Sequence, residues 1–225
     1  MVNKTRVSLP PDERKEEIIN SAWHLFYEKG YSNVTIKDVI KDLHIVKGTF
    51  YYHFKNKEEV KKIIVNRQIK TELRSLEKIF NNPNYSTLEK LSNMIMEIID
   101  VYKDTEKIHN VYTRNPELFQ DILIKRMESL EKIMEKLLNE GIEEKVFNPS
   151  YYDEALEFLV VSLSITLPII HYTINLWPER KAVLKLNVFT YNAEHMLGAK
   201  RGSFDNIKSQ YWHIVKDTSI GTIKT

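Results

Sequence analysis

The chain has 225 residues, of which 42% are hydrophobic and 28% are charged, and its formal net charge is +2. It contains no cysteine, which excludes disulfides, thiolate catalysis and cysteine-based zinc or iron–sulfur sites. Glycine and proline are few, and period-two runs of Val, Ile and Thr are scarce. The sequence therefore predicts an all-helical protein made of one large domain or two modest ones.

The charge is unevenly distributed along the chain. Residues 1–78 contain 16 Lys and Arg against 11 Asp and Glu, a net of +5, whereas residues 79–225 contain 17 against 20, a net of −3. A basic N-terminal part is typical of a nucleic-acid-binding surface, although solvated helices also carry extra lysines. Residues 1–12 lack the apolar core of a signal peptide, so we expect a cytoplasmic protein.

The first predicted helix spans residues 12–29. Its apolar residues recur at helical spacing and form one face: Ile18, Ala22, Leu25 and Phe26. Gly30 follows at a position where a left-handed backbone ends many helices. Tyr31 is then expected to fold back onto Phe26.

Two short helices are predicted next, at residues 35–43 and 47–54, with a tight turn between them. Thr35 and Asp38 form a capping-box pattern at the start of the first of these helices. Phe50 and Phe54 lie one turn apart on the second helix and are expected to face the core. This arrangement is typical of a helix-turn-helix, whose second helix enters the major groove of DNA.

The outer surface of this second helix offers groups that suit phosphates and base edges. The missing side chain of Gly48 lets the backbone approach DNA closely. A solvated lysine face beside core aromatic residues is the simpler alternative, and partial burial of Tyr51 fits it equally well. The predicted DNA-binding residues are Thr35, Lys37, Lys47, Gly48, Thr49, Tyr51, Tyr52, His53 and Lys57.

Longer helices are predicted in the rest of the chain. One begins after Asn56, which pairs with Glu59 in a second capping-box pattern, and ends before Pro83. Residues 158–178 carry no formal charge and approach the length of a membrane span. Their serine, threonine, histidine and asparagine residues are too polar for a lipid-facing helix, so we expect a buried helix and no membrane partner. Further amphipathic helices are expected at residues 88–102, 116–141, 150–176, 181–197 and 204–214.

The predicted fold is all-α, with about nine to ten helices in total. Residues 1–56 are expected to form a three-helix helix-turn-helix DNA-binding domain, and residues 57–202 a helical ligand-binding and dimerisation domain. Residues 203–225 would add a C-terminal helix and tail. The long helix after Asn56 joins the first two parts without a Gly/Ser hinge, so motion in one should reach the other.

Residues 48–59, which read GTFYYHFKNKEE, closely resemble the recognition-helix signature of the TetR (tetracycline-repressor) family. The resemblance extends to Phe26, Gly30, Tyr31 and residues 35–43. It implies a cytoplasmic homodimer that binds a near-palindromic operator in double-stranded DNA and releases it when a small molecule enters the C-terminal bundle. The expected function is a ligand-responsive transcriptional regulator, and repression is expected in preference to activation.

Two residues depart from the pattern of the family. His44 replaces the usual glycine of the turn, and histidine tolerates a left-handed backbone better than most residues, at some strain. Val46 stands where a capping Ser or Thr is usual, so the recognition helix is expected to lack a side-chain cap. These departures leave the expected fold intact but make the operator sequence uncertain.

The helices at residues 150–176 and 181–197 carry more apolar surface than one contact can cover. The resemblance implies that this pair forms a four-helix bundle across a two-fold axis, while burial within one subunit is the alternative. The predicted dimer interface consists of Leu156, Leu159, Val160, Leu163, Leu167, Leu186, Phe189, Ala193, Met196 and Leu197.

Several aromatic, histidine and methionine side chains are expected to point into the C-terminal bundle. Such a mixture suits a mostly apolar cavity with a few orienting polar groups, although a single His or Met more often belongs to the core. The sequence shows no ligand spacing of a metal site, and no cofactor is expected. The predicted ligand-binding residues are Met94, His109, Tyr112, Phe119, Met127, His171, Tyr172 and Trp177.

Two other classes of function compete with the regulator. An all-α enzyme acting on a small hydrophobic molecule would need a catalytic pattern, but the chain has no G-x-S-x-G motif, phosphate-binding glycine loop or spaced acid/base pair. A helical adaptor could bind another protein through the uncharged helix. The sequence favours a DNA-binding protein that is not an enzyme.

Overall fold

The structure is a computed structural model that describes residues 9–101, 115–172 and 179–211. The described residues form helices and loops without a strand, which confirms the predicted all-α class. They divide into two compact units. Among the described helices, none has both the length and the apolar character that a membrane crossing requires.

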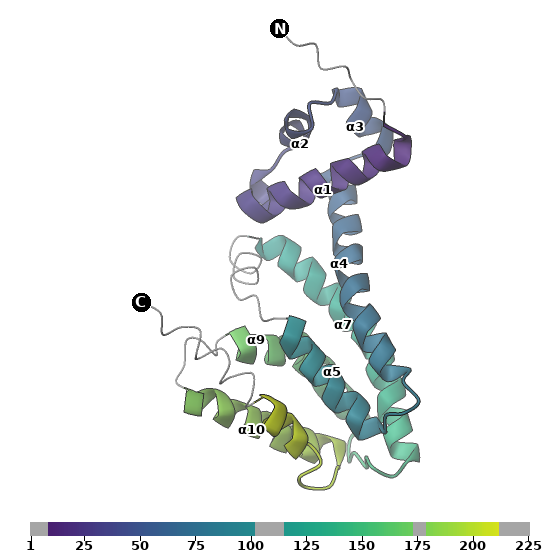
Figure 1. The fold of residues 1–225 in the computed structure, drawn as a ribbon, viewed down its shortest axis with the longest axis vertical. Coiled ribbons are helices and arrows are strands. Elements are labelled where there is room, and N and C mark those ends of the chain that lie inside the picture. Colours follow the sequence, from purple (N-terminus) through teal and green to yellow (C-terminus); the bar gives the residue numbers. More distant parts are fainter. Residues whose placement is uncertain (1–8, 102–114, 173–178, 212–225) are drawn as a thin grey trace. The chain divides into compact units, whose positions relative to one another are not determined.

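The first unit contains the described residues up to Gln68 and those from Asn115 to Ile122. Within it α1 contacts α2, and α2 contacts α3 (Figure 1). The first three helices begin and end within one residue of their predicted bounds. The elements of this unit are α1 (Pro11–Lys29), the short 3-10 helix η1 (Tyr31–Asn33), α2 (Ile36–Asp42), α3 (Lys47–His53), the first part of α4 (Lys57–Phe80) and the start of α7 (Pro116–Glu143).

The core of the first unit is built from the predicted apolar faces. Tyr31 folds back onto Phe26, with 4.9 Å between the two ring centroids, after Gly30 turns the chain with a φ of 84°. Burial of this many apolar groups stabilises the unit because each removes surface from water. The buried core residues are Ile18, Ile19, Ala22, Leu25, Phe26, Tyr31, Val34, Val39, Phe50, Phe54, Val60 and Ile64.

The start of α2 and the turn between α2 and α3 have the features that the sequence predicts. The Thr35 hydroxyl accepts a hydrogen bond from the backbone N–H of Asp38, whose carboxylate accepts one from the Thr35 N–H. His44 has a φ of 53°, and its Nδ1 lies 2.6 Å from the Lys41 carbonyl oxygen. Val46 precedes α3 without a side-chain capping bond, as expected.

The second unit contains the rest of α4 and α7 together with the remaining helices. Within it α10 contacts α8 and α9, and α5 contacts α9. Figure 1 labels α5, α9 and α10. The chain is helical again over residues 205–211. The other elements of this unit are α5 (Thr87–Val101), α8 (Tyr152–Val161), a π-helical segment (Ser162–Thr166), α9 (Leu167–Tyr172) and α10 (Glu179–Leu197).

Two predicted boundaries differ from the structure. The division between the units falls within α4, after Gln68, because the first turns of this helix pack into the core of the first unit. Phe204, Ile207 and Tyr211 are fully buried in the core of the second unit, so the described residues after 203 do not form a separate part. The predicted helix at 150–176 is continuous from Tyr152 to Tyr172, the end of its described part, but it includes a π-helical turn.

Candidate functional site

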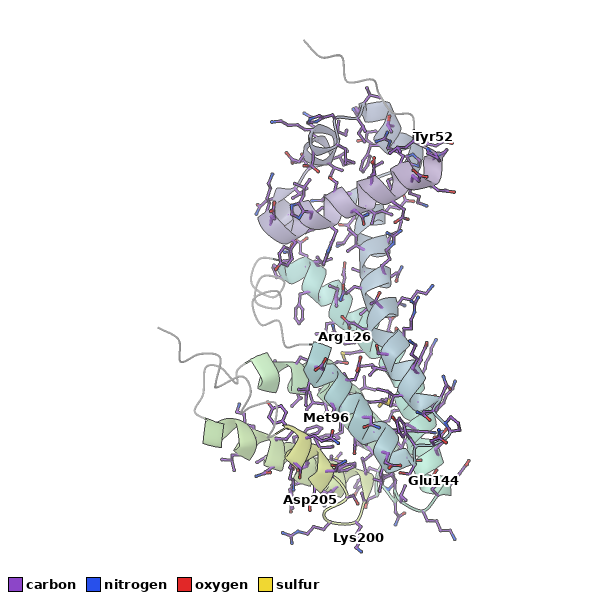
Figure 2. All side chains as sticks on the ribbon, in the orientation of Figure 1. Tyr52, Met96, Arg126, Glu144, Lys200 and Asp205 are labelled. Atoms are coloured by element: carbon purple, nitrogen blue, oxygen red, sulfur yellow. The ribbon has the colours of Figure 1, made fainter. Side chains whose placement is uncertain are left out.

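The outward face of α3 carries exposed aromatic residues. Phe50 and Phe54 are each 1% exposed and anchor the helix to the core, as predicted. Tyr52, labelled in Figure 2, is 76% exposed, and Tyr51 is also exposed. Phenol groups on this face can donate hydrogen bonds to phosphate oxygens.

The first turn of α3 is open to solvent. Lys47 and Gly48 are exposed, and a Cβ added to Gly48 would meet no atom within 4 Å. The Lys47 ammonium lies 5.6 Å from the centroid of the Tyr51 ring. Thr49 and His53 are partly buried, so they offer less surface than predicted. The backbone of this turn can therefore come close to the surface of a partner molecule.

A groove with a cationic rim runs between α2 and α3. Lys37, Lys41 and His44 form one side of it, and Lys47 and Tyr51 form the other. The isoleucines at positions 36, 40 and 45 line the floor. The sequence prediction missed Lys41 and His44, although Lys41 lies one helical turn after Lys37 and His44 follows in the turn after α2. Thr35 and Lys37, the other predicted residues near the start of α2, are exposed.

Lys57 lies in the first turn of α4, as predicted, but its ammonium group bonds within the first unit. Its ammonium group donates hydrogen bonds of 2.8 Å to the carbonyl oxygens of Tyr31 and Val34. It also lies 3.9 Å from the centroid of the Tyr31 ring. Burial lowers the pKa of Lys57, and Glu117 and Glu58 oppose that change. Lys57 therefore fixes the loop after α1, and its contact with DNA stays a prediction.

Charged side chains join the start of α7 to α4 inside the first unit. The Lys61 ammonium lies 2.8 Å from a carboxylate oxygen of Asp121 and 3.0 Å from one of Glu58. Burial by itself lowers the pKa of Lys61, but Asp121 and Glu58 together raise it above 10.5. The Asn115 side chain accepts a 2.7 Å hydrogen bond from the Tyr31 N–H. These contacts hold the start of α7 in the same unit as the helix-turn-helix.

The second unit contains a narrow cavity of about 20 Å³, room for about one water molecule. Arg126 of α7, labelled in Figure 2, is 7% exposed and forms two hydrogen bonds with Glu72 of α4, at 2.9 and 3.1 Å. Most of the remaining wall is apolar. The lining residues are Glu72, Leu73, Leu76, Glu97, Ile98, Arg126, Leu130 and Leu163.

Of the predicted ligand-binding residues, the three whose side chains the structure describes, Met94, Phe119 and Met127, do not line this cavity. Met94 is fully buried in the core of the second unit, and Met127 packs against that core. Phe119 lies in the first unit and is partly buried. The remaining predictions stay untested because His109, Tyr112 and Trp177, and the side chains of His171 and Tyr172, lie outside the described residues.

Most of the predicted dimer-interface residues are buried within the subunit. They form part of the core of the second unit and have little surface left for a partner: Leu159, Val160, Leu163, Leu167, Leu186, Phe189, Ala193 and Leu197. Leu156 and Met196 are partly buried. The two predicted helices therefore present a different set of side chains to solvent.

The same helices display an exposed apolar surface. It consists of the partly exposed Val161 and Ile165 and the exposed Ile169 on one side, and of the exposed Leu184 and Val188 of α10 on the other, and we call it the apolar face. These side chains line a shallow hollow. Leu184 is 59% exposed and Val188 is 52% exposed. Contiguous exposed apolar surface of this kind is typical of a protein interface.

Residues 18–61 match the family model described as "Bacterial regulatory proteins, tetR family". The biofilm operon negative transcriptional regulator IcaR of Staphylococcus epidermidis is 48% identical over 46 residues, which are 20% of this chain and 25% of that protein. IcaR of Staphylococcus aureus is 30% identical over 127 residues, 54% of this chain and 66% of that protein. The aligned part thus spans a quarter of the first relative's length and just under two thirds of the second's.

Solved structures share the fold. The transcriptional regulator FadR of Bacillus subtilis, solved in complex with stearoyl-CoA, matches with a TM-score of 0.57 and 20% sequence identity. The match covers 78% of this chain and 95% of that chain. At this level of identity the match supports the arrangement of helices and carries no information about a ligand.

Proposed function

Because the chain belongs to the TetR family of bacterial regulatory proteins, we propose that it is a transcriptional repressor of the cytoplasm that binds a near-palindromic operator as a homodimer and is released by a small molecule. The exposed first turn of α3 carries the proposal. Lys47, Gly48 and Tyr52 are open to solvent, while Phe50 and Phe54 hold the helix to the core. A helix that is anchored on one face and basic on the other is suited to the major groove.

The cationic groove between α2 and α3 supports phosphate binding beside α3. Lys37 and Lys41 extend the positive surface of Lys47 along the outer side of the helix-turn-helix. Lysine contacts to phosphate give affinity that does not depend on sequence, whereas contacts from the first turn of α3 would select the bases.

The apolar face supports dimerisation through α8, α9 and α10. Leu184 and Val188 would each gain hydrophobic contacts if a second copy covered them. A two-fold axis brings the same surface of both copies together, which suits one self-complementary apolar patch. A dimer would then present two α3 helices to two half-sites about 34–36 Å apart or a multiple of that spacing.

The cavity in the second unit supports a mechanism for release. At about 20 Å³ it is too small for an organic ligand, so an effector must spread the helices around it. Glu72, Leu73 and Leu76 of α4 line the cavity, and the first turns of the same helix belong to the first unit. An effector would therefore displace α4 and change the separation of the two α3 helices in the dimer.

The experiment begins with selection of bound DNA from a random pool, followed by titration of the selected site with two variants. Lys47→Ala and Tyr52→Ala should each weaken binding about tenfold. Lys47→Ala should also reduce the slope of log affinity against log salt concentration by about one, because one phosphate contact is lost. Matched controls on the second unit are Lys200→Ala and Tyr151→Ala, since Tyr151 is 70% exposed. Equal affinities of wild type, Lys47→Ala and Tyr52→Ala would disprove the α3 interface.

A further inference from the structure

Val46 presents an apolar side chain at the start of the recognition helix. It is 52% exposed and makes no capping bond to α3. A Ser, Thr, Asp or Asn at this position would stabilise the helix relative to an apolar residue. The preceding residue, Ile45, packs against the core of the first unit, but Val46 does not. Neither capping nor core packing therefore accounts for the valine.

The neighbours of Val46 belong to the surface that would face DNA. Lys47 and Gly48 follow directly and are exposed, and the space beyond Gly48 is open. Lys37, Lys41 and Lys47 supply the positive charge of the adjacent groove. In helix-turn-helix proteins the first residues of the second helix contact base edges. An isopropyl group at this position would therefore lie against bases and not against phosphates.

The chemistry of the side chain restricts the base that it can recognise. Valine has no hydrogen-bond donor or acceptor on its side chain, so it cannot read the polar atoms of the major groove. The C5-methyl group of thymine is the apolar group that the groove presents. We propose that Val46 selects a thymine in each operator half-site through contact with this methyl group. The inference rests on the proposed DNA binding and adds a base preference to it.

The test removes the methyl group from the DNA without changing base pairing. In the operator selected from a random pool, each thymine is replaced in turn by deoxyuridine, and the affinity of the wild-type protein is measured. Loss of one buried methyl-sized contact should weaken binding about fourfold at one position in each half-site. Other thymines should tolerate the replacement.

A coupled variant assigns the contact to Val46. Val46→Ala should bind the thymine operator about fourfold or more weakly than wild type and should distinguish thymine from deoxyuridine less than wild type does at that position, since only the Cβ methyl group remains. Ile124→Ala is the control, because Ile124 is an exposed apolar residue of the second unit, at 49%. It should keep the full deoxyuridine effect. Thermal unfolding checks that Val46→Ala folds as wild type does.

Each outcome decides the inference. A position at which deoxyuridine weakens the wild type more than it weakens Val46→Ala supports it. A scan without any sensitive thymine, or a deoxyuridine effect of equal size in wild type and Val46→Ala, overturns it while leaving the proposed function in place. Failure to select any DNA overturns both.

Discussion

Replacement of Gly48 by alanine is expected to raise the stability of the protein and to lower its affinity for DNA. Alanine has the higher helix propensity by about 1 kcal/mol, and a Cβ at this position meets no atom of the protein within 4 Å. Gly48→Ala should therefore raise the free energy of unfolding. The added methyl group would occupy the space that the backbone needs to approach DNA, so operator affinity should fall about tenfold. Thermal unfolding and a gel-shift titration measure the two effects.

Gly141→Ala provides the contrasting control. A Cβ at Gly141 would overlap the ring of Phe147, so this variant should lose stability instead of gaining it. Its folded fraction should bind the operator with wild-type affinity, because Gly141 lies in the second unit. Unchanged operator affinity in Gly48→Ala would show that the backbone of α3 does not approach DNA at this residue.

The sequence best predicts whether a side chain faces inward or outward where a core contact fixes the orientation of the helix. Phe50 and Phe54 must face inward, so Tyr52 must face outward, and the structure confirms both assignments. The hydrogen bonds of Lys57 were not predictable, because its partners are the backbone carbonyl groups of Tyr31 and Val34. The direction of a carbonyl group depends on how the loop folds, and residue types carry little information about it.

The first turn of α4 is tied to the loop after α1 by a pH-sensitive contact. The Tyr31 hydroxyl donates a hydrogen bond to Glu58, and this bond, followed by Lys61, holds the pKa of Glu58 below its ordinary value of 4.5. A lowered folded-state pKa stabilises the protein fully above pH 4.5, and that stability is lost as the pH falls through the folded-state value. Glu58→Gln should therefore unfold at a lower temperature than wild type at pH 7, with the difference shrinking below pH 4.5.

The measurement is the thermal midpoint between pH 7 and pH 3. Glu128→Gln is the control, because the ion pair of Glu128 with Lys125 is exposed on one helix. It should follow the wild-type pH profile closely. Parallel profiles for Glu58→Gln and wild type would show that this contact does not link α4 to the loop.

At the scale of helices, the sequence predicts where a helix begins and ends better than it predicts which of its faces is buried. The observed ends of α1, α2 and α3 lie within one residue of the predicted ones, and Gly30 and the Thr35 cap mark two of these ends. The orientation of the helix from Tyr152 to Tyr172 was not predictable, because it is apolar on several sides. Leu159 and Leu163 face the core, whereas Val161 and Ile165 line the hollow of the apolar face. Periodicity alone does not distinguish two such faces.

At the scale of the whole molecule, regulation would depend on helices that belong to both units. α4 passes from the first unit to the second after Gln68, and α7 passes after Ile122. The start of α7 is bound to the first unit through Lys61 and Asp121, while Arg126 of the same helix bonds Glu72 of α4 beside the cavity. An effector that widens the cavity would therefore act on two helices that continue into the DNA-binding unit.

The last prediction concerns the apolar face as the dimer interface. Leu184→Asp combined with Val188→Asp places like charges opposite each other across a two-fold axis, which costs several kcal/mol in an interface. The dimer dissociation constant should rise at least about 100-fold, as measured by sedimentation. The fold should persist because both side chains are exposed. Operator binding should weaken as well, since a monomer contacts one half-site.

Ile142→Asp is the matched control, since Ile142 is an exposed apolar residue of the second unit outside the apolar face. It should remain dimeric and keep its operator affinity. If the double variant stays dimeric at micromolar concentration with unchanged DNA binding, the two copies associate through another surface. The half-site spacing would then have to be derived from that surface, because the position of the two-fold axis sets the distance between the two α3 helices.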